Sequence, residues 1–327
     1  MYKPPFTITN QMLNSSISIS QKIERISSYQ SLKRMPTLRR NNKIRSIHSS
    51  LSIEANSFSL SQVRDVIDGK LVTGPKKEID EVKDAYKAYE IIELYDGFKE
   101  KDLLKAQGII AHSIDKEAGK YRSHPEGVID EHGNVIHIAP SEKMVPSLMG
   151  DLFCWLKKDK QTPLLIKSCI FHYEFVFIHP FGDGNGRTAR LWQNVLLMKW
   201  NPIFEYISIE SHIYKFQTQY YEAIAKSNKS GTSNTFIEFM LKMIEEAIDE
   251  TLENMQQETK NISEQVNRLL EVMEPDIPLS ANEIMNRLGI KSKETLRGSY
   301  LNVALKNGLI KMTLPDKPKS KNQKYYK

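Results

Sequence analysis

The stretch from residue 163 to residue 200 constrains the fold more than any other part of the chain. An apolar segment, PLLIKSCIFHYEFVFI, runs into the loop IHPFGDGNGRTAR, and the apolar pattern resumes in TARLWQNVLLMKW. Apolar residues recur at three- and four-residue spacings on both sides of the loop, which predicts two helices. One glycine is enough to turn a chain, and this loop holds three. We therefore expect two core helices joined by a loop whose backbone lies close to a ligand.

The same helical spacing dominates most of the chain up to about residue 256. Residues 127–138 differ, because two short β-branched runs flank the turn sequence DEHGN and so predict a β-hairpin. The expected fold class is therefore mainly α, with one hairpin inside a helical core. We place a loosely held N-terminal arm with some helix at residues 1–61, the helical core at 62–255, and a linker helix and a small domain at 256–327.

The last of these segments carries the signals of a winged helix. Ser280 and Glu283 form a capping-box pattern at the start of one helix, and Gly308 is suited to end a second. Two short strands around a Pro- and Lys-rich turn follow. From Pro278 onward there are eleven Lys or Arg residues against three Asp or Glu, a balance that suits contacts to DNA phosphates. Winged helices also bind proteins, so the sequence leaves the partner open between DNA and protein.

Composition is that of a globular protein. With 327 residues, 40% of them hydrophobic, the chain is long enough for about two domains with a sizeable core. A net charge of +6 favours polyanionic partners. The N-terminus has no secretory pattern, and polar residues interrupt the most apolar run, so we expect no membrane span and a cytoplasmic protein. Cys154 and Cys169 are expected to be buried, reduced thiols.

The loop residues form a pattern suited to phosphate. Gly184, Asn185 and Gly186 allow successive backbone N–H groups to converge on an anion, at the positive end of the helix that follows. Arg187 and Arg190 stand three residues apart on one face of that helix, where both can grip phosphate oxygens. We expect these five residues to bind the phosphates of a nucleotide.

Two further loop residues supply reactive groups. Asp183 is a hard oxygen ligand of the kind that holds Mg²⁺ together with substrate phosphates. His179 has an ordinary pKa that suits proton abstraction near neutral pH. An EF-hand would need an oxygen ligand where Arg187 stands, and a P-loop would need a lysine after its last glycine. The pattern therefore predicts phosphoryl or nucleotidyl transfer from a metal-bound polyphosphate.

The segment HPFGDGNGRTAR resembles the signature of the Fic family, His-Pro-Phe-x-Asp/Glu-Gly-Asn-Gly-Arg-x-x-Arg, at every fixed position. GKYR at 119–122 and the hairpin at 127–138 extend the resemblance. It implies a Fic-type helical bundle and a protein adenylyltransferase, an enzyme that moves AMP from ATP to a hydroxyl group of a target protein. It also implies that His179 is the general base, that Asp183 holds Mg²⁺, and that the hairpin is a flap that aligns a target segment by strand addition.

An upstream segment, SSLSIEANSFSL at 49–60, resembles the inhibitory motif of Fic proteins, Ser/Thr-x-x-x-Glu-Gly/Asn. Ser50 and Glu54 fill its first and fifth positions, whereas Ala55 stands where glycine or asparagine is expected. A capping box would need the acid three residues after the serine, not four. The resemblance implies autoinhibition, in which Glu54 pairs with Arg190 and denies that arginine to the γ-phosphate of ATP.

Other assignments stay open between alternatives. Tyr220 and Tyr221 either stack on the nucleotide base or pack in the core, whereas His172 is expected to be a hydrogen-bonded core residue. One alternative to AMP transfer is AMP removal, with Glu54 orienting a water. The other is a DNA-binding regulator that uses the winged helix. The sequence does not decide whether the chain forms a homodimer.

Overall fold

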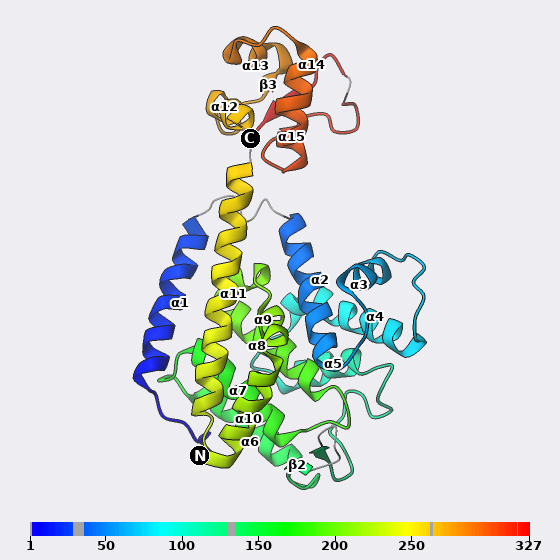
Figure 1. Ribbon diagram of the computed structural model, residues 1–327, viewed down its shortest axis with the longest axis vertical. Coiled ribbons are helices and arrows are strands. Elements are labelled where there is room, and N and C mark those ends of the chain that lie inside the picture. The colour runs from blue at the N-terminus through cyan, green and yellow to red at the C-terminus, as the bar shows by residue number, and fades with distance from the viewer. Residues whose placement is uncertain (1, 29–35, 130–134, 262–263, 319) are drawn as a thin grey trace. The chain divides into compact units, whose positions relative to one another are not determined.

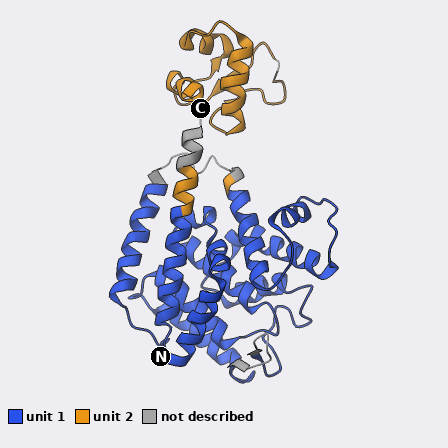
Figure 2. Cartoon of the chain, in the orientation of Figure 1, with its two compact units in different colours: residues 1–26, 39–249 blue, residues 27–38, 250–327 orange. Residues whose placement is uncertain are grey.

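The computed structural model describes residues 2–28, 36–129, 135–261, 264–318 and 320–327. Figure 2 shows two compact units. Unit 1 comprises residues 1–26 and 39–249, and unit 2 comprises residues 27–38 and 250–327. Unit 1 thus includes most of the segment expected to be a separate N-terminal arm. The C-terminal part of unit 2, residues 250–327, begins close to the expected linker helix.

Helices form most of the chain, in agreement with the predicted fold class (Figure 1). The helices are α1 (Asn10–Ser28), α2 (Pro36–Ile53), α3 (Leu60–Ile67), α4 (Lys76–Glu90), η2 (Ile92–Leu94), α5 (Glu100–Ile110), α6 (Val145–Lys158), α7 (Leu164–Ile178), α8 (Asn185–Trp200), η3 (Pro202–Tyr206), α9 (Ile209–Lys215), α10 (Gln217–Ser230), α11 (Asn234–Asn261), α12 (Glu264–Val272), α13 (Ala281–Leu288), α14 (Lys293–Thr295), η4 (Leu296–Leu301) and α15 (Asn302–Lys306). Among the described residues, no helix combines the length and the apolar character needed to cross a membrane.

Helices α7 and α8 pack extensively against each other in the core of unit 1. Helix α7 is apolar on all sides and nearly all of its residues are buried, as expected of a helix at the centre of a domain. His172 on α7 bonds through Nδ1 to Gln193 at 2.6 Å and through Nε2 to the hydroxyl of Tyr220 at 2.9 Å. It is fully buried, so the expectation of a hydrogen-bonded core histidine is confirmed. Both cysteines are unpaired, Cys169 buried and Cys154 partly exposed.

The N-terminal segment differs from the expected loose arm. Helix α1 buries Met12, Ile19, Ile23 and Ile26, which recur at helical spacing and give the helix one apolar face. The residues before it are also attached to unit 1, since the hydroxyl of Tyr2 donates to a carboxylate oxygen of Glu174 on α7 at 2.7 Å. The basic and serine-rich composition of this segment obscures the apolar face in the sequence.

The predicted hairpin is present. Strands β1 (Gly127–Ile129) and β2 (Val135–Ile138) are antiparallel, with Gly127 opposite Ile138, and a register shift between Val128 and Ile129 marks a bulge. The N–H of Ala139 donates to the carbonyl of Glu126 at 3.2 Å and closes the base of the hairpin. The expected turn at residues 130–134 lies outside the described residues.

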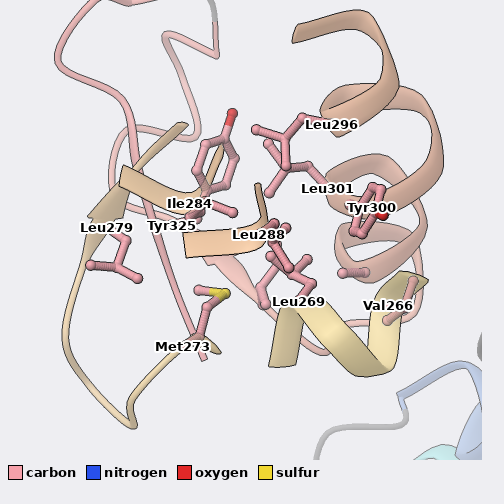
Figure 3. Close-up of a cluster of buried hydrophobic side chains, with 12 residues drawn as sticks. Val266, Leu269, Met273, Leu279, Ile284, Leu288, Leu296, Tyr300, Leu301 and Tyr325 are labelled. Carbon is pink, nitrogen blue, oxygen red and sulfur yellow. The ribbon is translucent and has the colours of Figure 1, made fainter. Parts of the chain in front are cut away.

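Unit 2 has its own hydrophobic core. Figure 3 shows side chains such as Leu269, Ile284, Leu301 and Tyr325 gathered between the helices and the sheet. The sheet has the order β3-β5-β4, with both pairs antiparallel, and its strands are β3 (Leu279–Ser280), β4 (Lys311–Met312) and β5 (Lys324–Tyr326). Unit 2 thus combines helices with a three-stranded antiparallel sheet.

The sequence signals for unit 2 act as predicted. Ser280 caps α13 through a reciprocal pair with Glu283. Gly308 adopts a φ of +66° just beyond α15, the left-handed conformation that ends many helices. Local capping chemistry therefore fixes the start of α13 and the end of α15.

Candidate active site

His179 occupies the turn between α7 and the glycine-rich loop. It is the C-cap residue of α7 in a left-handed conformation, with φ +51° and ψ +61°, and its N–H donates to the carbonyl of Phe175 at 3.0 Å. This conformation is unfavourable for a residue with a Cβ and persists only where surrounding contacts hold it. Such contacts come from Arg122, whose Nε donates to the carbonyl of His179 at 2.8 Å.

The loop itself is held by its own side chains and by α5. The side-chain amide of Asn185 donates to the carbonyl of Phe181 at 2.7 Å and accepts from its N–H at 3.0 Å. Phe181 is fully buried, as expected. Gly184 precedes α8 with φ +77°, and Gln107 donates to the carbonyl of Asp183 at 3.1 Å. The loop is therefore preorganised at the positive end of α8.

The two arginines of the motif have different partners. Arg187 bonds to a carboxylate oxygen of Asp183 at 2.7 Å and lies 3.5 Å from Glu81. Arg190 has a side chain only 1% exposed and bonds to Glu54 at 2.8 Å. It also donates to the hydroxyl of Ser50 at 3.0 Å and to the carbonyl of Ser50 at 2.9 Å. The structure thus joins the motif of residues 49–60 to the loop, although 136 positions separate Glu54 from Arg190.

The carboxylate of Glu54 lies directly against Gly186. A Cβ added to Gly186 would collide with Oε1 of Glu54 and would stand 3.1 Å from Nη1 of Arg190. Position 186 therefore has no room for a side chain while Glu54 is in place. The side chain of Glu54 is 32% exposed to solvent. Its negative charge therefore lies at the accessible edge of the predicted phosphate cradle.

Electrostatics keep Glu54 ionised and His179 neutral. Burial opposes the charge on Glu54, but the positive charges of Arg190 and Arg187 outweigh it and hold the pKa of Glu54 below its ordinary 4.5. Burial lowers the pKa of His179 below 6.5, and the nearby charge of Glu126 opposes that shift only in part. At neutral pH the imidazole can therefore accept a proton.

Polar residues recur every four positions along α2 and one residue beyond its end: Asn42, Ser46, Ser50 and Glu54. Asn42 donates to the carbonyl of Tyr206, and Ser46 donates to Glu210 at 2.8 Å. The period of four keeps these side chains close to one face of the helix. The sequence contains this stripe but does not reveal which surface the helix docks on.

Glu210 is a functional candidate that the sequence does not reveal. Its carboxylate is 1% exposed and accepts hydrogen bonds from Ser46 on α2, Tyr89 on α4 at 2.8 Å and Asn194 on α8 at 2.6 Å. Burial raises its pKa above the ordinary 4.5. These bonds tie the helix that carries Glu54 to the helix that carries Arg190.

The two candidate tyrosines lie in different environments. Tyr220 is 2% exposed and its ring packs against His172 and Phe236, which is the core-packing alternative. Tyr221 is 46% exposed and its hydroxyl lies 3.5 Å from the carbonyl of Ile53 at the end of α2. Its exposed ring is therefore the one of the two that a planar ligand can reach.

The residues present suit a magnesium ion that comes with its nucleotide. Among the described residues, no cluster of three or more His, Cys, Asp or Glu side chains could hold a metal alone. Asp183 is 46% exposed beside the cradle, and one carboxylate plus substrate phosphates is a common way to bind Mg²⁺. The donor set thus fits this ion.

Comparisons with known proteins identify the family of the chain. A model of the Fic/DOC family matches residues 97–197, and a model described as "Filamentation induced by cAMP protein Fic-like, C-terminal domain" matches residues 264–326. A crystal structure of a Fic family protein from Desulfovibrio desulfuricans is 40% identical, with 99% of this chain and 98% of that chain covered and a TM-score of 0.76. The chain belongs to the Fic family.

Relatives of greater length carry functional names. A Nematostella vectensis protein named "Protein adenylyltransferase Fic" is 31% identical over 218 residues, which are 62% of this chain and 47% of the relative. An Aedes aegypti protein of the same name is 29% identical over 282 residues, 82% of this chain and 51% of the relative. The chain thus spans about half the length of these relatives. Fic-1 from C. elegans, 21% identical with a TM-score of 0.63 and covering 76% of this chain and 73% of that chain, shares the fold.

Ala55 lies just beyond the end of α2, at the position where the inhibitory motif of Fic proteins has glycine or asparagine. The N–H of Asn56 donates to the carbonyl of Leu51, and the N–H of Ala55 donates to that of Ser52, both at 3.1 Å, which is a Schellman motif. Ala55 therefore adopts a left-handed conformation with φ +64°. The helix ends as it would with glycine, at a cost of about 1–2 kcal/mol for the strained alanine.

We predict that Ala55→Gly stabilises the protein by about 1 kcal/mol, because glycine adopts a positive φ without strain. The free energy of unfolding should be measured by urea titration. Ala225 is the matched control, since it is exposed inside α10 and should lose about 1 kcal/mol on replacement by glycine. Equal losses of stability in the two variants would contradict a strained helix end at Ala55.

Proposed function

We propose that the chain is a protein adenylyltransferase, which transfers AMP from ATP to a hydroxyl side chain of a target protein, and that Glu54 holds it in an inhibited state. One observation carries the proposal: the carboxylate of Glu54 lies against Gly186 and on Arg190. An anion of the chain therefore occupies a place suited to anions, beside the positive charges of Arg190 and Arg187. The names of the relatives support AMP as the transferred group.

In the proposed reaction, His179 takes the proton of the target hydroxyl. The hydroxyl oxygen attacks the α-phosphorus of ATP and forms a new P–O bond, while the bond to the bridging oxygen breaks and pyrophosphate leaves. Nδ1 of His179 is buried within the protein, so Nε2 is the nitrogen proposed to accept the proton. The N–H groups of residues 184–186 stabilise charge on the phosphates.

Asp183 is the proposed ligand of Mg²⁺, together with the substrate phosphates. When bound, the ion neutralises negative charge that develops on those phosphates. Arg187 bonds to Asp183 and so holds the carboxylate beside the cradle. The other ligands of the proposed reaction have separate sites. The exposed ring of Tyr221 is the proposed stacking surface for the adenine. The hairpin is the proposed flap for the target segment.

We propose a cytoplasmic location for the protein. Its free Cys154 and Cys169 fit that location, where thiols stay reduced.

The inhibition follows from two anions that compete for one cation. The γ-phosphate of ATP and the carboxylate of Glu54 both require the guanidinium of Arg190, and they repel each other at the short separation that sharing would impose. ATP therefore binds with a displaced terminal phosphate. Positioning supplies most of the catalysis in phosphoryl transfer, so a small displacement of the α-phosphorus costs a large factor in rate.

The assignment of the base predicts that His179→Ala lowers AMP transfer by about 10²–10⁴-fold, the usual contribution of a general base. Calorimetry should show nearly unchanged ATP affinity, because the phosphates contact backbone and arginines. In the unsubstituted protein, the acid limb of the pH–rate profile should have a midpoint below 6.5. Burial lowers the pKa of His179, so the imidazole stays neutral down to a lower pH. Near-normal transfer by the alanine variant would contradict the role.

The assignment of Glu54 predicts that Glu54→Gly raises labelling of protein from α-labelled ATP by about 5- to 150-fold, the range of an ordinary coupling energy of about 1–3 kcal/mol. The gain should vanish when Arg190 is also replaced. Glu54→Gln is the matched control, since it keeps the size and removes the charge, and a smaller gain would show how much of the inhibition is steric. Thermal melting must be compared in each variant.

Unchanged labelling by a folded Glu54→Gly variant would show that this residue does not inhibit. Loss of AMP removal from a modified protein in that variant would instead support the hydrolytic alternative, in which Glu54 orients a water. The two outcomes are separate because one assay follows label entering protein and the other follows label leaving it.

Unit 2 supports a second function, binding of duplex DNA. The helix from residue 293 to residue 306 exposes Thr295, Ser299, Asn302 and Lys306 at helical spacing, side chains that can reach base edges or phosphates. The turn between β4 and β5 exposes Lys317 and Lys321. We propose that this helix enters the major groove and that the lysines contact the backbone.

This proposal predicts a steep fall of DNA affinity with salt, because each phosphate contact releases counterions. Replacing Lys317 and Lys321 by Gln should reduce the slope of log affinity against log salt by about 0.9 for each phosphate that is no longer neutralised. Replacing Lys76 and Lys77, which are exposed in unit 1, should leave the slope unchanged. Absence of any complex at low salt would refute DNA binding and leave protein docking as the role of unit 2.

A further inference from the structure

Arg122 is a buried cation whose guanidinium donates to backbone carbonyls. Its side chain is 3% exposed, and it donates from Nε to the carbonyl of His179 at 2.8 Å, from Nη1 to that of His124 at 2.8 Å, and from Nη2 to that of Pro140 at 2.5 Å. A buried charge is costly unless its donors are satisfied. The three carbonyls therefore account for the presence of this cation in the interior.

The three acceptors belong to three different parts of the site. His179 carries the proposed base, at the left-handed end of α7. His124 lies three residues before β1, and Pro140 lies two residues after β2. The N–H of Arg122 also donates to the carbonyl of Pro180 at 2.9 Å. One side chain therefore fixes the end of α7 and both ends of the hairpin at once.

The flap has a second attachment to the same helix end. Nε2 of His137 lies 2.7 Å from the carbonyl of Phe177, and the ring centroids of these two residues are 5.0 Å apart. A carbonyl can only accept, so His137 is the donor in this bond. Phe177 stands two residues before His179. The hairpin is thus held to the last turn of α7 from its strand as well as from its base.

We propose that Arg122 is the positioning residue that sets the distance and orientation between the flap and the base, and thereby places the target hydroxyl against His179. The proposal rests on the proposed AMP transfer. A target segment aligned on the flap takes its position from the hairpin, and the imidazole takes its position from the left-handed turn. Arg122 bonds to the backbone on both sides, so it determines the geometry in which the two meet.

The shape of the guanidinium is essential to this role. Its five N–H donors lie in one plane with fixed directions, which lets it bond to three carbonyls that point in different directions. A lysine ammonium is a compact point charge on a flexible stem. It can keep the positive charge and part of the hydrogen bonding, but not the three bonds in one plane.

The test compares Arg122→Lys with Lys167→Met, both made in a Glu54→Gly parent. Lys167 is the matched residue, because it is also buried and donates to two backbone carbonyls, those of Leu156 at 2.8 Å and Asp159 at 2.6 Å. Lys167→Met removes those bonds at a place away from the loop. Both variants should lower the melting temperature.

Only Arg122→Lys should lower the rate of AMP transfer at saturating ATP, by about 10²-fold, which is the cost of roughly 1 Å of misplacement. The rate is measured as label from α-labelled ATP that enters the chain itself, at temperatures well below both melting points. ATP affinity should stay unchanged, because the bonds of Arg122 go to the flap and the turn. Equal rates in Arg122→Lys and the parent would overturn the proposal, as would an equal loss in Lys167→Met.

A second readout does not depend on AMP transfer. Hydrogen exchange at the amides of Ala139 and His179, which donate to Glu126 and Phe175, should be faster in Arg122→Lys than in Lys167→Met. If the parent transfers no AMP, the proposed function fails while the exchange result still decides whether Arg122 holds the flap and the base together. Unchanged exchange at both amides would overturn the positioning role.

Discussion

The site depends on the hydrogen bonds and the ion pair that the buried guanidinium of Arg190 makes. The Arg190 side chain is 1% exposed, and its bonds to Ser50 and Glu54 join α2 to α8 across the chain. A guanidinium cannot lose its proton at any ordinary pH, so this position always requires an acceptor. In this structure Ser50 and the anionic Glu54 are the acceptors, and in the proposed active state the γ-phosphate replaces Glu54. The same requirement thus explains both the docking of α2 and the inhibition.

The glycine-rich loop is predictable from the sequence because short-range chemistry determines it. Two glycines before a helix, a third in its first turn, an acid and two arginines at fixed offsets define a loop and its charge without reference to the rest of the fold. The caps of unit 2 are predictable for the same reason, since Ser280 and Glu283 act within one turn.

Long-range contacts cannot be predicted in this way. Nothing next to Glu210 in the sequence shows that Ser46, Tyr89 and Asn194 donate to it, because those residues come from three different helices. Arg122 likewise stands in a short polar segment, and the acceptors of its side chain lie up to 57 positions away. The expectation of a loose arm was wrong for α1 because polar residues separate its buried isoleucines. Such features depend on which helices become neighbours.

Exclusion of the γ-phosphate by Glu54 can be tested with ADP, which lacks that phosphate. Calorimetry should measure the affinities of ATP and ADP for the unsubstituted protein and for the Glu54→Gly variant at one pH and one Mg²⁺ concentration. If Glu54 excludes the γ-phosphate, the substitution raises the ratio of ATP affinity to ADP affinity by about 5- to 150-fold, with ADP affinity nearly constant. A ratio that does not change, or an equal gain for both nucleotides, would contradict this exclusion.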